Sequence, residues 1–193
     1  MLRWVVLALV GAAVCTVGDH LHATHGVLYY VHPVFWDQAW WVPLLFAAAS
    51  LAAVLGATPW RRLLGSRSER PATGREIAGD GIAFATAYAV TSFLPADRPD
   101  VTLALLAVWW LARVVRGRAT WLIVYSLLMA LSGTAFEAGW SALGFFCYRH
   151  PDFAGVPRWL PGIYLHAALI AGPLERVLRG ADADRPDAHG PAT

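Results

Sequence analysis

The sequence predicts an all-α, polytopic membrane protein with six transmembrane helices. Of its 193 residues, 58% are hydrophobic and only 15% are charged. Residues 39–56 are apolar for about the length that a bilayer core requires. This stretch opens with Trp40, Trp41 and Pro43, and indole rings favour the membrane interface while proline is tolerated in a first helical turn. Similar apolar stretches recur along the chain, so we expect a bundle of membrane-spanning helices.

The other elements follow from the same pattern. The apolar run 4–17 continues through residues 18–22 without a cleavage pattern, which indicates a retained first span. We expect further spans at 77–94, 101–115, 120–146 and 159–178, the last repeating the Trp-then-Pro opening of the second. The fourth is short for a bilayer core of about 30 Å. The predicted domains are a six-helix transmembrane domain over 1–179 and a disordered cytoplasmic tail over 180–193.

The arginines predict the orientation. All fifteen basic residues are arginine, and six spans place both termini on one side of the membrane. Twelve arginines fall on that side, and only Arg98, Arg149 and Arg158 fall opposite. Both termini are therefore expected to be cytoplasmic. Because the arginines lie in loops rather than in a basic domain, we expect no nucleic-acid partner.

Small residues recur at every fourth position of the second and third spans, so these helices should pack closely. Small residues within helices and aromatic residues near their ends can leave a cleft for a lipid. The alternative for the tryptophans is that they are interfacial anchors. The candidate lipid-binding residues are Trp40, Trp41, Pro43, Phe84, Ala87, Tyr88, Thr91, Ser92 and Trp140.

Ionisable residues within the spans suggest a second kind of site, because charges in hydrocarbon face protein or water. Five such residues should lie in the outer half of the bundle: Asp19, His20, His22, Glu137 and His166. The i, i+3 spacing of Asp19 and His22 could supply half of a metal site, but it also suits a solvated helix end. No H-E-x-x-H motif is present, and Cys15 and Cys147 have no metal-site spacing.

Asp80 and Glu175 lie near the predicted cytoplasmic helix ends. We expect them to form interfacial ion pairs with arginines such as Arg75, Arg176 or Arg179.

Three separate segments together resemble the Insig family of sterol-regulatory membrane proteins: Ala39-Trp-Trp-Val-Pro43, Thr102-Leu-Ala-Leu-Leu followed by Trp109-Trp110, and Pro151-Asp-Phe153 with Arg158-Trp-Leu-Pro161. The resemblance covers most of the chain in order and spacing. It implies a six-helix membrane protein without catalytic activity or cofactor. Eukaryotic members bind oxysterols, retain the Scap–SREBP complex in the endoplasmic reticulum and assist degradation of HMG-CoA reductase. Where they carry an Asp before a Phe, important for Scap binding, this chain has Ser92 before Phe93, so lipid binding is the property expected to transfer.

Two functional hypotheses result. The first is a non-enzymatic, sterol-sensor-like protein that holds an apolar lipid, a sterol or a diacylglycerol, in a cleft within the bundle. An arginine-only composition suggests a bacterial homologue in the cell membrane, with another membrane protein and a second copy of the chain as candidate partners. The second is a metal-assisted intramembrane enzyme built on Asp19, His20, His22, Glu137 and His166.

Overall fold

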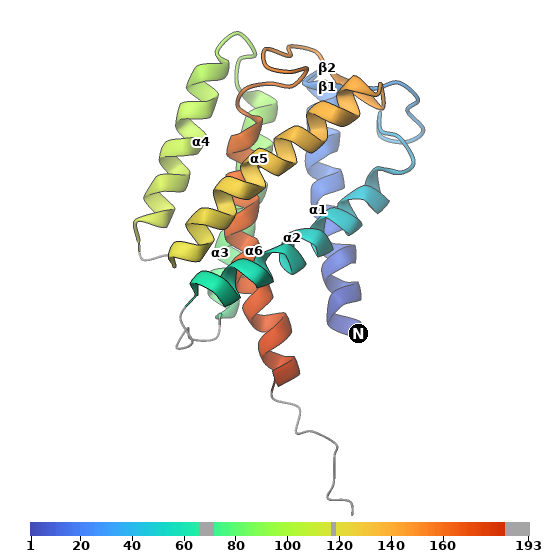
Figure 1. Ribbon diagram of the computed structural model, residues 1–193. Coiled ribbons are helices and arrows are strands. Elements are labelled where there is room, and N and C mark those ends of the chain that lie inside the picture. The colour runs from blue at the N-terminus through green and yellow to red at the C-terminus, as the bar shows by residue number, and fades with distance from the viewer. Residues whose placement is uncertain (66–71, 117–118, 184–193) are drawn as a thin grey trace, which may run out of the picture.

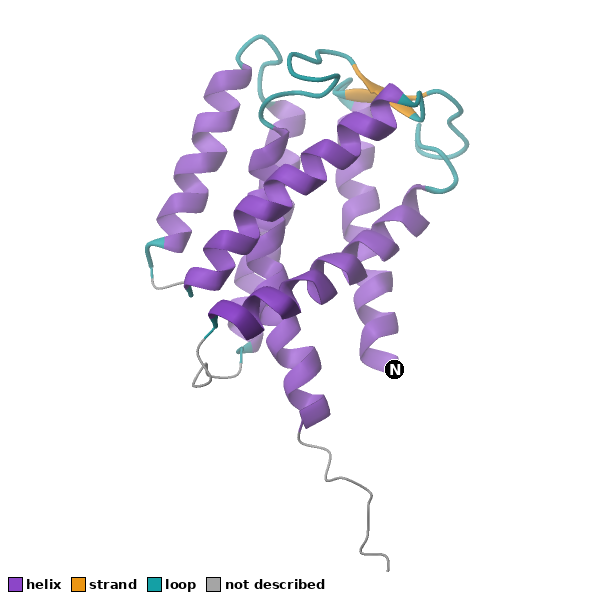
Figure 2. Ribbon diagram, in the orientation of Figure 1, coloured by secondary structure: helices purple, strands orange, loops and turns teal. Residues whose placement is uncertain are grey.

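The computed structural model describes residues 1–65, 72–116 and 119–183, which form a helical bundle with a small sheet at one end (Figure 1). The helices are α1 (Leu2–Thr24), α2 (Val42–Leu64), α3 (Gly74–Phe93), α4 (Pro99–Val114), α5 (Thr120–Ala142) and α6 (Leu160–Ala183). The strands are β1 (Leu28–Tyr30) and β2 (Phe146–Tyr148). The strands and the longer loops lie at the end of the bundle away from the N-terminus (Figure 2). The six helices follow the six predicted spans in order.

Local sequence explains several helix ends, and some differ from the prediction. Pro43 occupies the first turn of α2 as predicted, but α2 begins at Val42 and extends past the predicted end at 56 to Leu64. The Thr73 side chain and Glu76 form a capping box at the start of α3. The predicted fifth span is wrong at its end, because α5 stops at Ala142 and Gly144, with φ of +77°, turns the chain into β2. Helix α6 reaches Ala183, past the predicted start of the tail at 180, and residues 184–193 lie outside the described part.

The structure contains an internal repeat. The first unit, α1–β1–α2, recurs as the second unit, α5–β2–α6, at an offset of 118 residues (Thr120 against Leu2). The sequences match best in the segments between the helices, where the identical pairs are Gly26/Gly144, Tyr30/Tyr148, His32/His150, Pro33/Pro151, Phe35/Phe153, Trp41/Trp159 and Pro43/Pro161. The shared Trp-then-Pro opening seen in the sequence is therefore part of a longer duplication.

The two units meet at the sheet. Strands β1 and β2 pair antiparallel, and Tyr29 lies opposite Cys147, its own equivalent in the repeat. Antiparallel pairing of equivalent residues relates two identical elements by a local two-fold axis, which here passes between the strands. Each unit then closes its loop with an isolated bridge, Phe35 with Gln38 and Phe153 with Val156.

Helices α3 and α4 follow the first unit and break this symmetry. Helix α3 packs against α1 and α6, and α4 packs against α6. On the other side of the bundle α2 packs directly against α5 and α6, and the Tyr125 hydroxyl of α5 donates a hydrogen bond to the Ala53 carbonyl of α2. Ala87, predicted to lie on a packing stripe of the third span, is fully buried.

Three helices of the described chain, α1, α2 and α5, are long and apolar enough to cross a membrane. Helix α4 has only 16 residues. Helices α3 and α6 carry buried carboxylates at Asp80 and Glu175. Membrane crossing by these last three helices and the cytoplasmic termini remain predictions.

Candidate functional site

Asp19 forms a buried polar centre in the first unit. Its side chain points from α1 toward the sheet, and the residue is only 3% exposed. One carboxyl oxygen accepts hydrogen bonds from the Tyr30 hydroxyl and from Gln38 Nε2, each at 2.6 Å. Burial, and then the Asp19 carboxylate, raises the pKa of Tyr30, so this phenol stays a neutral donor. Asp19 thereby ties α1 to β1 and to the loop before α2.

Glu137 is the equivalent centre in the second unit. It occupies the repeat position of Asp19 and accepts from the Tyr148 hydroxyl, which is the equivalent of Tyr30. Its second oxygen accepts from the Tyr164 hydroxyl of α6 at 2.5 Å. Burial raises the pKa of Tyr148, and the neighbouring Glu137 carboxylate acts in the same direction. Both carboxyl groups therefore serve as internal acceptors: Asp19 joins α1, β1 and the connector before α2, whereas Glu137 joins α5, β2 and α6.

His22 lies one turn beyond Asp19 on α1 and contacts α3. Its Nε2 lies 2.8 Å from the Thr91 hydroxyl, which itself donates to the Tyr88 carbonyl, so Nε2 is the donor to Thr91. The imidazole also packs on the Tyr88 ring, with centroids 4.6 Å apart, and against the ring edge of Trp159. His22 is thus an anchor between α1, α3 and the start of α6.

Four partly exposed aromatic side chains lie in two pairs against the core beside these polar centres. We call Trp41, Phe84, Tyr88 and Trp140 the aromatic cluster; all four pack on the core that also contains Ala87. The Trp41 and Trp140 rings lie 5.0 Å apart, and the Phe84 and Tyr88 rings 5.9 Å apart, both edge to face. The first pair joins the residue before α2 to α5, the second pair lies on α3, and both pairs pack against the same core although they are far apart in the sequence.

Comparisons with known proteins agree with this architecture. The chain is 29% identical over 182 residues to an INSIG protein homolog of Mycolicibacterium vanbaalenii, covering 86% of this chain and 82% of that protein. It also matches the crystal structure of the mycobacterial Insig homolog MvINS from Mycobacterium vanbaalenii, with a TM-score of 0.78 and 26% identity over 96% of this chain and 97% of that one. This chain thus resembles Insig homologs in both sequence and fold. A crystal structure of a cross-linked MvINS trimer matches equally well, and no protein-family model matches the chain.

The Insig resemblance seen in the sequence is thus confirmed, and with its apolar helices the chain is a membrane protein. Five of the predicted lipid-binding residues lie in or against one cluster of this Insig homologue: Trp41, Phe84, Ala87, Tyr88 and Trp140. Trp40 is 64% exposed and points away from that core. Pro43 lies in the first turn of α2. The Thr91 and Ser92 hydroxyls both donate hydrogen bonds to the Tyr88 carbonyl, so these two donors already have an acceptor within the protein.

The residues of the predicted metal site are not brought together in this Insig homologue. His166 contacts Arg113 at 2.6 Å and the Leu106 carbonyl at 3.1 Å, in a network separate from that of Asp19. His20 bonds the Trp36 carbonyl. Within the described residues, no group of three or more His, Cys, Asp or Glu side chains could hold a metal ion. Tertiary packing gives these side chains different protein partners, so the predicted metal site does not form among the described residues.

Asp80 and Glu175 form ion pairs with arginines as predicted, but with arginines of other helices that the sequence did not single out. Arg113 of α4 lies 2.7 Å from Asp80 of α3, and the same guanidinium reaches His166 of α6. Arg61 of α2 lies 2.5 Å from Glu175 of α6. Charge counting along single helices could not find these partners, because each pair joins helices that are distant in sequence.

Proposed function

We propose that this Insig homologue is a non-enzymatic membrane protein that binds an apolar lipid, a sterol or a diacylglycerol, against the aromatic cluster. The observation that carries the proposal is the cluster itself: partly exposed rings from three helices beside a packed core. Ligand sites of this kind combine apolar and aromatic walls with a few polar groups. The nearby carboxyl groups of Asp19 and Glu137 are engaged by tyrosine and glutamine donors, which favours a structural role for them over acid–base catalysis.

Tyr88 is the polar group best placed to contact the lipid. Its ring packs so closely on α1 that a Cβ at Gly18 would lie 2.8 Å from it, so glycine is required there. The Tyr88 hydroxyl forms no hydrogen bond within the described residues, unlike the hydroxyls of Tyr30, Tyr148 and Tyr164. A hydroxyl or ester oxygen of a lipid could therefore bond it.

The energetics favour selection by shape. One such hydrogen bond contributes about 1 kcal/mol, whereas burial of apolar surface contributes about 25 cal/mol per Å² where water had wetted the site. In a membrane the site already contacts lipid chains or detergent, so the net gain is a difference between two apolar occupants. Affinity should be moderate rather than tight.

The proposed setting is a cell membrane crossed by all six helices, with both termini in the cytoplasm. The packing of α3, α4 and α6 in the same bundle as the three strongly apolar helices supports this (Figure 1). The pairing of Asp80 and Glu175 with arginines reduces the cost of placing them there. Since a related structure is described as a cross-linked trimer, we also propose that the chain self-associates, and that lipid occupancy biases contact with a membrane-protein partner.

The test is photolabelling of the detergent-purified chain with a photoreactive sterol or diacylglycerol in competition with its unlabelled parent. Ala87→Phe adds bulk behind the cluster and should abolish specific labelling, while Leu105→Phe on an exposed face of α4 should leave it unchanged. Tyr88→Phe removes only the hydroxyl and should weaken labelling about fivefold, the equivalent of one hydrogen bond of about 1 kcal/mol. Labelling of the cluster that excess parent lipid does not suppress, or that survives Ala87→Phe in a folded protein, would refute the proposal.

A further inference from the structure

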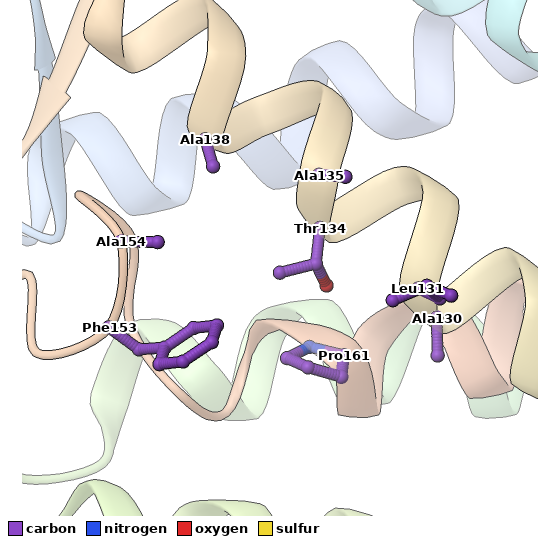
Figure 3. A pocket seen from close by; sticks show the side chains of 8 residues that line it. All are labelled: Ala130, Leu131, Thr134, Ala135, Ala138, Phe153, Ala154 and Pro161. Carbon is purple, nitrogen blue, oxygen red and sulfur yellow. The ribbon is translucent and has the colours of Figure 1, made fainter.

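A pocket of about 550 Å³ lies between α5 and the start of α6 (Figure 3), and none of the four residues of the aromatic cluster lines it. Its volume is within the range of about 300–1,000 Å³ that is usual for small-molecule sites. The lining residues are Ala130, Leu131, Thr134, Ala135 and Ala138 of α5, Phe153 and Ala154 of the following loop, and Pro161 of α6. None of these residues is charged.

Thr134 gives the pocket its polar group. It is 8% exposed, and its hydroxyl has no hydrogen-bond partner among the described residues. A helical Ser or Thr usually bonds the carbonyl one turn earlier. Ser126 of the same helix does so with the Leu122 carbonyl at 2.7 Å. The Thr134 side chain instead projects into the space between α5 and Pro161 (Figure 3).

The internal repeat provides a comparison for this pocket within the same chain. At the offset of 118 residues, Ala138 corresponds to His20 and Ala154 to Trp36. In the first unit the Trp36 and His20 rings lie 5.2 Å apart, and His20 Nδ1 lies 3.0 Å from the Trp36 carbonyl. Trp36 and Ala154 have the same left-handed backbone, with φ of 50° and 47°. The first unit thus covers this position with its own aromatic pair, whereas the second unit has two alanines there.

We propose that this pocket binds a neutral membrane lipid, whose hydrocarbon occupies the place of the Trp36–His20 pair and one of whose oxygens accepts a hydrogen bond from Thr134. Helix α5 is one of the three helices apolar enough to cross a membrane. At the rim of the pocket Leu131 is 72% and Phe153 62% exposed, so it opens toward the hydrocarbon layer. The uncharged lining selects against lipids that need a charged partner inside the pocket. This site is independent of the aromatic cluster and does not require that the cluster bind lipid.

The first experiment uses the full chain in detergent and a diacylglycerol with a diazirine in one acyl chain. Cross-linked peptides are mapped with and without excess diacylglycerol. Ala154→Trp installs the side chain that the first unit carries at the same backbone conformation, so it should be accommodated. It should lower labelling around Thr134 at least tenfold and leave labelling of α3 unchanged. Leu127→Trp, on an exposed face of the same helix, is the matched control and should change neither.

Two further variants test the polar contact and the repeat. Thr134→Val keeps the side-chain volume and removes the hydroxyl, so it should weaken competition by diacylglycerol severalfold but not labelling by a photoreactive alkane. Trp36→Ala should create a second labelled site on α1, which would raise the number of bound lipids.

The proposal is overturned if wild-type labelling near Thr134 is absent or is not suppressed by excess diacylglycerol. Labelling that survives Ala154→Trp in a folded protein overturns it as well. If Ala154→Trp does not fold, Thr134→Val decides, because equal competition in the variant and the wild type excludes the hydrogen bond. Labelling of α3 alone would refute this pocket and leave the aromatic cluster standing, and labelling near Thr134 alone would do the reverse.

Discussion

Replacing Asp19 with alanine removes the acceptor of two buried hydrogen bonds. The Tyr30 hydroxyl would lose its acceptor inside the protein, which costs about 1–3 kcal/mol. Gln38 Nε2 would keep its bond to the Thr16 carbonyl at 3.0 Å, so its loss is one hydrogen bond of about 1 kcal/mol. Removing a buried carboxyl relieves part of its desolvation. We therefore expect Asp19→Ala to lower the free energy of unfolding by about 2–3 kcal/mol.

A double-mutant cycle isolates the interaction. Tyr30→Phe leaves Asp19 bonded to Gln38 and should cost about 1–2 kcal/mol. In the double variant neither partner is left unpaired, so the two costs should not add, and the coupling should be about 1–2 kcal/mol. For a chain of this size 1 kcal/mol shifts the thermal midpoint by about 2–4 °C. Tryptophan fluorescence during heating in detergent would report this non-additivity.

Glu137, the equivalent of Asp19 in the internal repeat, allows a second double-mutant cycle. Glu137→Ala removes the acceptor of two phenols, Tyr148 and Tyr164, so its cost should be at least as large as that of Asp19→Ala. Tyr29→Phe alters an exposed strand residue and is the matched control that should leave the midpoint unchanged. Additivity within about 0.5 kcal/mol in both cycles would refute the conclusion that these carboxyl groups tie the units together.

Two other measurements test topology and packing. In a chain whose native cysteines are replaced with serine, an impermeant thiol reagent applied to intact cells should label Val34→Cys but not Ala72→Cys, and the reverse pattern would invert the proposed orientation. Gly133→Ala should destabilise the protein by about 1–3 kcal/mol, because its Cβ would lie 2.3 Å from the Tyr164 ring. Gly139→Ala on the same helix meets no atom within 4 Å and should be neutral or stabilising by up to about 1 kcal/mol, so equal thermal midpoints for the two variants would contradict this packing.

The sequence was sufficient to predict the helices because apolar length and small-residue spacing are local signals. It was insufficient for the sheet. Residues 145–148 are as apolar as a helix end, and only pairing with residues 28–30, more than a hundred positions away, makes them a strand. The predicted fifth span therefore extended to residue 146, beyond the end of α5 at Ala142.

The candidate site was predictable in part. Trp41, Tyr88 and Trp140, predicted as walls of a lipid cleft, pack against one core, while lipid binding by them stays a prediction. The donors to the two carboxyl groups were missed, because a tyrosine in a loop gives no periodic signal. One signal was available: each carboxylate precedes its tyrosine partner by 11 residues, Asp19 before Tyr30 and Glu137 before Tyr148.

The two units share their polar ties but differ in the faces beside them, and this difference explains where the aromatic cluster arises. On α1, Gly18 leaves room for the Tyr88 ring, and His22 forms a hydrogen bond with Thr91. Helix α3 therefore fits between α1 and α6. The equivalent positions on α5 are Phe136 and Trp140, whose rings lie 5.2 Å apart. These two bulky side chains would prevent a helix from packing on α5 as closely as α3 packs on α1.

Helix α5 instead packs on α2, where Trp140 meets Trp41. The contact of Trp41 with Trp140 is the counterpart, across the local two-fold axis, of the contact of Trp159 with His22. Tyr88 of α3 packs on His22 beside the first of these contacts, whereas no residue of α3 is in ring contact with Trp41 or Trp140 among the described residues. Duplication thus supplies a frame held by Asp19 and Glu137, and the insertion of α3 and α4 makes the two sides of that frame different. If this reasoning holds, variants of the carboxyl groups should lower stability before they alter lipid selectivity, whereas variants of Trp140 should do the opposite.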